Sequence, residues 1–462
     1  MTSIFIFRRD FRLNDNIGLI EACKNSKKVY PIFIFTPEQI DKNDYKADAC
    51  VQFMIESLKK LNTDLRKKES NLHLFHGDYL KVLEELVKKY KVDNIYTNTD
   101  YTPYAIERDQ NIEKLCQKLN VEFHAHHDNC LFTPGSILTG SDTIYQKFTP
   151  FYNECLKQKF PSTQKLKNKR SLSNFRDNKY QISFDDTKKF YQPNEDLHVK
   201  GGRKEAKKIL KNIKNFKNYD KDRNTLSIET TNLSAYLKFG CISIRECCNV
   251  LVDTFGKKDP MVRQLIWRDF YYHLGNGFIE RFGKELKPQY SKIKWSYDKS
   301  NLKKWQEGKT GFPVVDACMT QLNQTGYMHN RGRLIVASFL IKNLQIDWRE
   351  GEKYFAQNLA DYDPLVNQGN WQWVAGTGAD SQPYFRIFNP MTQSSKFDKD
   401  AVYIKKWLPN LKDVPAKHLH DWIKFHSEYD LKKIKYYEPM IDYKKSRDVT
   451  LKMYKKGIES YN

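Results

Sequence analysis

The stretch VYPIFIF, residues 29–35, carries only apolar and aromatic side chains around a single proline. An apolar run of this length, rich in β-branched and aromatic residues, predicts a strand that is buried on both faces. Helical patterns follow it over residues 51–61 and 80–87. Strands that alternate with amphipathic helices predict an α/β unit with a parallel, Rossmann-like sheet. The other predicted strands are 4–7, 72–75, 94–97 and 121–124.

We place this α/β unit at residues 1–135 and expect two further segments after it. Residues 136–200 show a weaker pattern, and residues 162–196 are rich in Lys, Asn, Ser and Asp. This composition predicts a connector that runs over the surface. Residues 201–462 show mostly helical periodicity, which predicts an all-α domain. A chain of 462 residues is too long for one hydrophobic core, so several domains are expected.

The charge balance favours a polyanionic partner. The formal net charge is +22 and the isoelectric point is about 9.3, and a surface of this charge attracts nucleic acid above other partners. A general enrichment of lysine would give the same charge without such a partner. Hydrophobic residues make up 40% of the chain and charged residues 29%, which is typical of a soluble globular protein.

The nine cysteines are scattered and form no CxxC pair, so we expect no structural zinc, no iron–sulfur cluster and no other metal. An odd number without a disulfide framework is typical of a reducing compartment. Arg8, Arg9 and Asp10 follow the first apolar run directly, which argues against a signal peptide. No apolar stretch reaches about 18 residues, so no membrane span is expected. We therefore expect a soluble, intracellular protein, with cytoplasm and nucleus not distinguished. We also expect a monomer.

Residues 360–390, ADYDPLVNQGNWQWVAGTGADSQPYFRIFNP, say most about function. Asp and Asn are rarely buried without partners, and a buried Trp needs an acceptor for its N–H group. A structural turn with two packing tryptophans is the alternative to a functional loop. This segment contains one proline and two glycines, which are Pro364, Gly369 and Gly376. These residues predict short helical pieces separated by tight turns.

The run TTNLS, residues 230–234, places consecutive hydroxyl groups before a predicted helix. Such a run caps the helix or binds phosphate, because the backbone N–H groups and the helix dipole point the same way. Capping is the commoner meaning of the pattern, and from the residues alone both readings stay open.

The run QLIWRDFY, residues 264–271, places Trp267 and Arg268 on one helical face with Gln264 and Tyr271. A tryptophan beside an arginine can stack on an extruded base and hold a phosphate. A half-buried aromatic residue with a surface arginine is the alternative.

Together these segments resemble the photolyase/cryptochrome family, and are most like its class I cyclobutane pyrimidine dimer photolyases. The likeness extends over nearly the whole chain. It implies an α/β domain that holds an antenna chromophore, followed by a helical domain that binds FAD. It also implies an enzyme that repairs UV-damaged DNA, in which light-driven electron transfer from reduced FAD splits the dimer. The motifs that carry the resemblance are RRDFR at 8–12, TTNLS at 230–234, QLIWRDFY at 264–271, YMHNRGR at 327–333 and the segment 360–390.

The resemblance implies an FAD site in the helical domain. Asn367 would face the flavin N5 atom, and Arg333 would pair with Asp361 beside the isoalloxazine ring. The TTNLS run would bind the diphosphate. The expected FAD contacts are Tyr219, Thr230, Thr231, Asn232, Leu233, Ser234, Arg268, Arg333, Asp361, Tyr362, Asp363 and Asn367.

By the same resemblance, Trp371, Trp348 and Trp295 would conduct electrons from the surface to oxidised flavin. The three tryptophans lie on separate segments, so only folding could align them. Taken singly, each would be interpreted as a packing residue.

Gln264 departs from the pattern of dimer photolyases, which carry glutamate there, and matches (6-4) photolyases and animal cryptochromes. Glutamine donates and accepts hydrogen bonds, but it supplies neither a proton nor a negative charge. (6-4) photolyases carry histidines at the positions of Asn330 and Leu334, and neither is histidine here. The substrate assignment therefore stays with the cyclobutane dimer. The implied DNA and lesion contacts are Arg223, Gln264, Trp267, Asn330, Arg331 and Trp373.

The RRDFR motif follows the first strand, at the carboxyl edge where such sheets bind ligands. Folate-binding members carry Asn-Glu where this chain has Ile106 and Glu107, which puts a folate antenna in doubt. A deazaflavin, another flavin or no antenna stay open. The functional alternatives are a (6-4) photolyase and a cryptochrome photoreceptor, although no long extension follows Leu411 such as many cryptochromes use for signalling.

Overall fold

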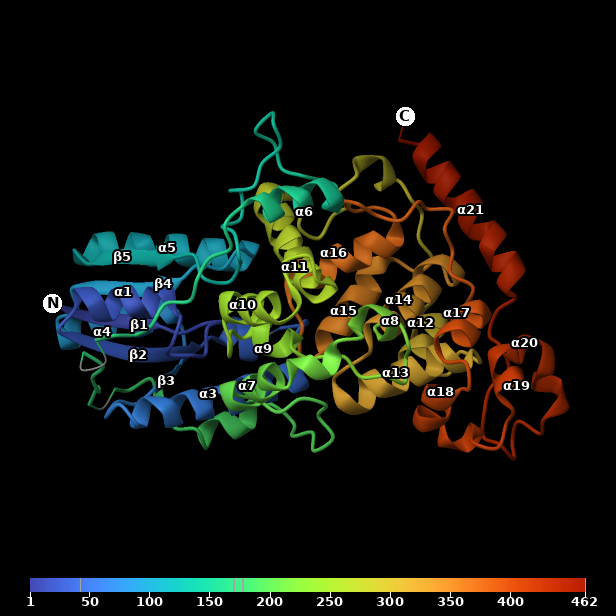
Figure 1. The fold of residues 1–462 in the computed structure, drawn as a ribbon, viewed down its shortest axis with the longest axis horizontal. Coiled ribbons are helices and arrows are strands. Elements are labelled where there is room, and N and C mark those ends of the chain that lie inside the picture. The colour runs from blue at the N-terminus through green and yellow to red at the C-terminus, as the bar shows by residue number, and fades with distance from the viewer. Residues whose placement is uncertain (42, 169–170, 177, 462) are drawn as a thin grey trace.

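The computed structural model describes residues 1–41, 43–168, 171–176 and 178–461. An α/β part near the N-terminus and a larger helical part lie side by side along the long axis of the molecule (Figure 1). This arrangement confirms the predicted fold class, a Rossmann-like parallel sheet followed by an all-α region.

The sheet has the strand order β5-β4-β1-β2-β3-β6. Its first five strands in the chain are mutually parallel, as the apolar runs predicted, and β6 is antiparallel to β3. The strands are β1 (Thr2–Ile6), β2 (Lys28–Phe35), β3 (His73–His76), β4 (Asn94–Asn98), β5 (Glu122–His126) and β6 (Gln181–Ile182).

Alternate residues of the central strands fill two different cores. Ile4 and Ile32 pack with residues of α4 and α5 on one face, whereas Phe5 and Phe33 pack with α1 and α3 on the other. This alternation follows from the two-residue period of a strand. The helices of this part are α1 (Ile17–Asn25), α2 (Pro37–Ile40), α3 (Asp48–Arg66), α4 (Tyr79–Tyr90) and α5 (Pro103–Leu119).

The segment between the two parts is more ordered than its composition predicted. It contains α6 (Phe148–Lys157), β6 and the 3₁₀ helix η1 (Asp186–Phe190). Buried side chains such as Leu172 and Phe190 anchor it in the main core, so it does not simply run over the surface. Residues 169, 170 and 177 of this segment lie outside the described residues.

The core that contains Phe5 and Phe33 continues into the helical part, where α10 and α11 contribute to it, and a second core lies further toward the C-terminus. The α-helices of this part are α7 (Arg203–Lys211), α8 (Tyr219–Asp222), α9 (Ser234–Lys238), α10 (Ile244–Phe255), α11 (Pro260–Gly277), α12 (Lys299–Gln306), α13 (Pro313–Thr325), α14 (Asn330–Ser338), α15 (Trp348–Asn358), α16 (Pro364–Ala375), α17 (Pro390–Phe397), α18 (Val402–Trp407), α19 (Ala416–His420), α20 (Trp422–Phe425) and α21 (Tyr443–Glu459). The shorter turns are the 3₁₀ helices η2 (Ile213–Phe216), η3 (Ile279–Arg281), η4 (Pro288–Tyr290), η6 (Pro409–Leu411) and η7 (His426–Glu428), and the π-helical turn η5 (Phe339–Asn343).

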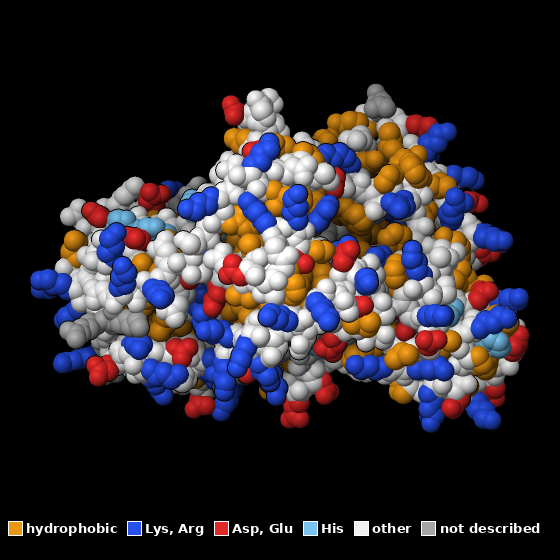
Figure 2. Space-filling model, in the orientation of Figure 1, with side chains coloured by type: hydrophobic (Ala, Val, Ile, Leu, Met, Phe, Trp, Pro, Cys, Tyr) orange, Lys and Arg blue, Asp and Glu red, His pale blue; other side chains and the backbone are white. Residues whose placement is uncertain are grey.

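Lys and Arg side chains are spread over the face drawn in Figure 2, and a group of them gathers over α3 and α7. All nine cysteines are free thiols, and only Cys50 is not fully buried. Within the described ranges, no helix has the length and apolar character that crossing a membrane requires. The same residues contain no cluster of side chains suited to hold a metal ion.

Candidate functional site

The helical part contains a cavity of about 570 Å³ between α9, α11, α14 and α16. Cavities of roughly 300–1,000 Å³ are typical of sites for small molecules and cofactors. Of the predicted site residues, only Thr230, Asn232, Trp348 and Trp295 lie away from its wall. The others line it, and they are Tyr219, Arg223, Thr231, Leu233, Ser234, Gln264, Trp267, Arg268, Asn330, Arg331, Arg333, Asp361, Tyr362, Asp363, Asn367, Trp371 and Trp373.

Helices α11 and α16 meet at two glycines, and this close approach builds one wall of the cavity. Gly369 lies against the ring of Tyr271, and a Cβ atom at residue 369 would sit 2.2 Å from that ring. Gly275 of α11 lies in the same way against Leu365 of α16. The prediction that Gly369 interrupts a helix is therefore wrong, because the packing of Tyr271 requires a glycine within one continuous helix.

Asp361 is held by two neighbouring side chains. The Arg333 Nη2 atom donates to both carboxylate oxygens of Asp361, at 3.1 and 2.9 Å, and the Ser234 hydroxyl donates to Oδ2 at 2.6 Å. The ion pair between Arg333 and Asp361 that the resemblance implied is thus present. Because all three residues line the cavity, they form a fixed polar patch on its wall.

Asp363 connects the first turn of α16 to the α/β part. Its Oδ1 atom accepts a hydrogen bond from the Val366 N–H group at 3.4 Å, which caps the helix. Its Oδ2 atom accepts hydrogen bonds from the Tyr272 hydroxyl at 2.6 Å and from the Arg9 guanidinium. Burial alone would raise the pKa of Asp363, but Arg9 and Arg268 outweigh burial and lower this pKa to about 2. The carboxylate is therefore charged at neutral pH.

Asn367 is oriented by Glu352, a residue that the sequence did not single out. The Asn367 amide nitrogen donates to the Glu352 backbone oxygen at 3.1 Å and to its Oε1 atom at 3.0 Å. The Tyr362 hydroxyl donates to the same Oε1 atom at 3.4 Å. Asn367 lines the cavity, and its carbonyl oxygen makes no hydrogen bond with any described residue. That oxygen is therefore available to accept a hydrogen bond from a ligand.

We expect Glu352→Gln to change how stability depends on pH. Burial raises the pKa of the Glu352 carboxyl to about 7, although the hydrogen bonds from Asn367 and Tyr362 oppose this shift. A folded-state pKa above the unfolded value means that the folded protein binds the proton more tightly. Glu352 therefore costs stability progressively as the pH rises from about 4.5 to about 7, by on the order of 3 kcal/mol in total.

The glutamine side chain would keep the amide acceptor for Asn367 without this titration. Chemical unfolding of the wild type and of Glu352→Gln, each with bound cofactor, should be followed between pH 5 and 8. The variant should gain stability relative to the wild type with rising pH. Two curves that stay parallel across this range would contradict the prediction.

Trp267 and Trp373 line the cavity from α11 and α16. Phe148 of α6 stacks on Trp267, with ring centroids 3.6 Å apart and planes inclined by 8°. One face of Trp267 is thus covered by protein, and the indole also lines the open cavity. Among the described residues, none forms a hydrogen bond with the Gln264 side chain, so its amide is available to a ligand.

Two arginines lie close together at the same cavity. The Arg331 Nη2 atom donates to Asn224 at 2.6 Å, and its guanidinium lies over the Phe397 ring at 4.2 Å. Burial and the neighbouring Arg223 both lower the pKa of Arg331. Two cations that repel each other favour a bound anion between them. Asn330 is exposed beside them and also lines the cavity.

The three predicted tryptophans lie on adjoining segments. The Trp371 ring lines the cavity and packs against the backbone of Gly351, which is three residues after Trp348 on α15. Trp295 precedes Ser296, whose N–H group donates to the backbone oxygen of Gln345 at 2.8 Å, close to the start of α15. Folding therefore brings together segments that are far apart in the sequence.

Two families match this chain. The family described as the FAD binding domain of DNA photolyase matches residues 261–456, and the family described as DNA photolyase matches residues 3–168. A deoxyribodipyrimidine photo-lyase of Buchnera aphidicola is 37% identical, over 98% of this chain and 96% of its own length. The Escherichia coli deoxyribodipyrimidine photo-lyase is 35% identical, over 98% of each chain. The chain belongs to the photolyase/cryptochrome family.

Solved structures of photolyase/cryptochrome proteins have the same overall fold. A photolyase from Sulfolobus tokodaii, solved with two FAD molecules, is 39% identical and superposes with a TM-score of 0.89, over 99% of this chain and 100% of its own. A cryptochrome from Synechocystis is 25% identical with a TM-score of 0.89, over 98% and 99% of the two chains. The helical part described above therefore corresponds to the FAD-binding part of this family.

The TTNLS run of this photolyase/cryptochrome chain lies only partly at the cavity. Thr231, Leu233 and Ser234 line the wall, whereas Thr230 and Asn232 do not. Asn232 has a φ angle of 53°, a left-handed conformation that Asn adopts more readily than most residues. Its side-chain nitrogen donates to Glu229 at 3.3 Å. This geometry favours a turn-forming role for Asn232 over direct contact with a ligand.

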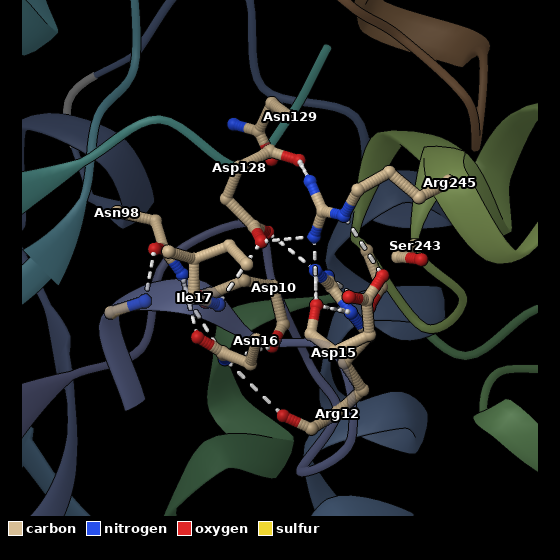
Figure 3. A network of polar contacts seen from close by, with 12 residues as sticks. Asp10, Arg12, Asp15, Asn16, Ile17, Asn98, Asp128, Asn129, Ser243 and Arg245 are labelled. Atoms are coloured by element: carbon tan, nitrogen blue, oxygen red, sulfur yellow. Dashed lines mark hydrogen bonds and ion pairs between the residues drawn. The ribbon is translucent and has the colours of Figure 1, made fainter. Parts of the chain in front are cut away.

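The RRDFR motif of this photolyase/cryptochrome chain divides between two locations. Arg12 is buried and donates to Asp128 at 2.5 Å, and Arg245 of α10 binds the other carboxylate oxygen of Asp128 at 2.7 Å (Figure 3). Arg245 also donates to Asp15 at 3.0 Å. Two arginines and two aspartates thus join the α/β part to α10, and Arg12 serves this contact.

Arg8 lines a second, smaller cavity of about 130 Å³ at the carboxyl edge of the sheet. Arg108 lines it too, and Asp109 forms ion pairs with both arginines, at 2.7 and 3.1 Å. The Nη2 atoms of Arg8 and Arg108 are both buried without a hydrogen-bond partner among the described residues. Ile106 and Glu107, the positions compared with folate-binding members, do not line this cavity.

Sequence reasoning missed Lys238 and Glu352. Lys238 lines the main cavity and belongs to the run that begins with TTNLS, so extending that motif by one helical turn would have included it. Glu352 lies on the amphipathic helix α15 without any local signal, because its contact with Asn367 depends on how α15 and α16 pack.

Proposed function

We propose that the protein repairs cyclobutane pyrimidine dimers in DNA, using FAD in the main cavity and blue or near-UV light. The observation that carries this proposal is the composition of one cavity. It combines Asn367 and the Arg333–Asp361 pair on one part of its wall with Trp267 and Trp373 on another. When bound, reduced FAD supplies one electron to the dimer on illumination and takes it back after the dimer has split.

The polar wall of the cavity fits a flavin. The free carbonyl oxygen of Asn367 can accept a hydrogen bond from a ring N–H group, and Glu352 keeps it in that orientation. Arg333 and Asp361 offer a charged pair to the ring system. We further propose that the remaining cofactor contacts come from residues along the same wall, which are Tyr219, Thr231, Leu233, Ser234, Arg268, Tyr362 and Asp363.

The aromatic and basic residues suit a nucleotide that has left the duplex. Trp267 and Trp373 would stack on the extruded dimer, and Phe148 supports Trp267 from behind. Arg223 and Arg331 would bind the phosphates on either side of it. Gln264 and Asn330 would hydrogen-bond to the lesion.

We expect the wild type to repair the cyclobutane dimer and not the (6-4) lesion. A neutral hydrogen bond from Gln264 contributes roughly 0.5–1.5 kcal/mol, whereas one with a charged partner contributes about 1.5–3 kcal/mol. Gln264→Glu should therefore keep repair or improve it, by up to about tenfold. The measurement uses oligonucleotides that each carry one defined lesion, illuminated with protein whose cofactor was reduced chemically and analysed by chromatography.

Two results would overturn this assignment. Repair of the (6-4) lesion alone would make the protein a (6-4) photolyase. No repair of either lesion, with reduced cofactor present, would favour a photoreceptor. Gln264 gives the first alternative some support, whereas Asn330 does not.

We propose that the smaller cavity binds the anionic portion of a second chromophore. Arg8 and Arg108 each have an unpartnered buried nitrogen atom, and Asp109 neutralises only one of the two cations. A phosphate group would satisfy both. The similar archaeal photolyase holds two FAD molecules, and a second flavin nucleotide would supply such a phosphate here, whereas the cavity of about 130 Å³ would enclose only part of it.

We expect the wild type, reconstituted with excess FAD and then desalted, to release more than one flavin per chain on heating. Arg8→Gln should reduce this number toward one, because it removes a partner for the phosphate. Arg66→Gln, which changes an exposed arginine of α3, is the matched control and should not reduce it. Release of a single flavin from every variant would exclude a second flavin at this cavity.

We propose that a single chain is the functional unit, because residues of one chain line both cavities. The nine free cysteines favour a reducing compartment inside the cell.

A further inference from the structure

Arg9 reaches from the end of β1 into the helical part and bonds to residues of both. Its Nη1 atom donates to Asp100 of the α/β part at 3.2 Å. Its Nε atom donates to the backbone oxygen of Lys238 at 3.2 Å, at the end of α9. Its Nη2 atom donates to the Tyr272 hydroxyl at 2.7 Å and to the Asp363 carboxylate. One buried guanidinium therefore connects the sheet with three segments of the helical part.

Two of these partners belong to the main cavity. Lys238 and Asp363 both line it. Asp363 also caps α16, the helix that carries Asn367 and Trp371 into the cavity. A shift of the Asp363 carboxylate would therefore move the first turn of that helix, since one of its oxygens binds the helix and the other binds Arg9 and Tyr272.

The Asp363 carboxylate is also shielded from solvent. The side chains of Asp363 and Arg9 are only 6% and 11% exposed. A buried carboxylate without a cationic partner takes up a proton or moves toward water. Arg268 lies over the Tyr272 ring at 4.6 Å and makes no direct bond to Asp363 among the described contacts. The direct ion pair of Asp363 is thus the one with Arg9.

We propose that Arg9, although it belongs to the α/β part, is a positioning residue of the FAD site. It holds Asp363 and the start of α16 in the arrangement that presents Asn367 and Trp371 to the cofactor. This inference rests on the proposed function only in taking FAD as the ligand of the main cavity. It assigns to the second arginine of the RRDFR motif a role in the opposite part of the molecule.

Arg12 offers a matched control from the same motif. It is buried more fully than Arg9 and also bonds across the contact between the two parts, to the Gly240 backbone oxygen at 3.1 Å. Its other partners are Asp15 and Asp128. None of these three residues lines the main cavity. The two arginines thus differ in whether their bonds reach the FAD site.

The test compares full-length Arg9→Gln, Arg9→Lys and Arg12→Gln with the wild type. All variants and their wild-type reference are made in the Arg8→Gln background, because Arg9 also lines the smaller cavity that is proposed to hold a second flavin. The protein is freed of flavin and titrated with FAD, and the absorption spectrum of the bound flavin is recorded. Arg9→Gln should weaken FAD binding roughly 10- to 100-fold, as expected for the loss of a charged hydrogen-bond partner. It should also blur the vibrational structure of the flavin spectrum, because the flavin environment is less fixed. Arg9→Lys should give an intermediate affinity, because an ammonium group can keep the bond to Asp363 but not all four bonds.

Arg12→Gln should lower the melting temperature and leave FAD affinity within about twofold of the wild type, because sites without shared partners act independently. Equal losses of affinity in Arg9→Gln and Arg12→Gln would show a general effect of separating the two parts and would overturn the proposal. So would an unchanged affinity in Arg9→Gln. If Arg9→Gln does not fold, Arg9→Lys and Tyr272→Phe decide the question. Arg9→Lys removes some of the four Arg9 bonds, Tyr272→Phe removes the hydroxyl bond to Asp363, and both keep a side chain of similar size. Unchanged FAD affinity in both variants would overturn the proposal. A wild type that binds no FAD would instead refute the proposed function.

Discussion

Trp371→Phe should nearly abolish the photoreduction of bound, oxidised FAD by an external reductant. Trp371 is the one member of the predicted triad that lines the main cavity. Its ring packs against Gly351, where a Cβ atom would sit 2.2 Å from the indole, and Gly351 lies on the same helix as Trp348. Phenylalanine fills most of this space but is much harder to oxidise than tryptophan. The first transfer from protein to cofactor would therefore fail, while the fold would stay intact.

The measurement is the rate at which the flavin absorption bleaches under blue light with excess reductant. Trp305 provides a matched control, because its ring lies 6.3 Å from that of Trp371 in a T-shaped contact. Trp305 is fully buried, its N–H group donates to the Val336 backbone oxygen at 3.0 Å, and it lines no wall of the cavity. Trp305→Phe should leave photoreduction largely unchanged.

Repair by Trp371→Phe should persist when the cofactor is reduced chemically beforehand, because the electron for repair comes from the cofactor itself. Equal photoreduction in the wild type and Trp371→Phe would reject the chain. Equal losses in Trp371→Phe and Trp305→Phe would mean that packing around the cavity, and not an ordered path, determines the rate.

The strands of the sheet could be predicted because their signal is local. Residues 29–35 are apolar throughout, and they are buried in the sheet. A run of this kind predicts a buried strand without knowledge of which strands lie beside it. The two-residue strand β6 carries no such signal, since it exists only through its pairing with Leu74 and Phe75 of β3. The continuity of α16 through Gly369 likewise depends on Tyr271, which is nearly a hundred residues away in the sequence.

The cavity residues and the Arg333–Asp361 pair were predicted by resemblance, whereas the partners of Asn367 and Asp363 were not. Asp361 and Asn367 stand in the segment that the sequence marked as unusual, yet the geometry of Asn367 depends on Glu352. The sequence placed Arg9 in the α/β domain, because the RRDFR motif comes shortly after the first strand. Its contacts with Tyr272 and Asp363 arise from the docking of two parts of the chain, which no local pattern encodes.

Asp361→Asn should weaken FAD binding by roughly 10- to 100-fold, because it leaves the Arg333 guanidinium unpaired at the cavity. Removing one partner of a buried ion pair costs about 3–5 kcal/mol. The Arg333 side chain is 25% exposed while that of Asp361 is 7% exposed, so solvent screening reduces the expected cost to about 1–3 kcal/mol. Asparagine has nearly the same shape and keeps an acceptor for Ser234, so the loss reports on charge and not on volume.

The FAD affinity of Asp361→Asn, Arg333→Gln and the double variant forms a cycle that isolates the pair. The double variant should bind FAD more tightly than the sum of the two single losses predicts, because it leaves no unpaired charge. Glu246→Gln is the matched control, since Glu246 accepts two bonds from Arg203 at 2.8 and 2.9 Å with both residues away from the cavity wall. That variant should lose stability and keep its FAD affinity. Strictly additive losses in the Asp361 and Arg333 cycle would mean that each residue contacts FAD independently, and that their ion pair does not organise the site.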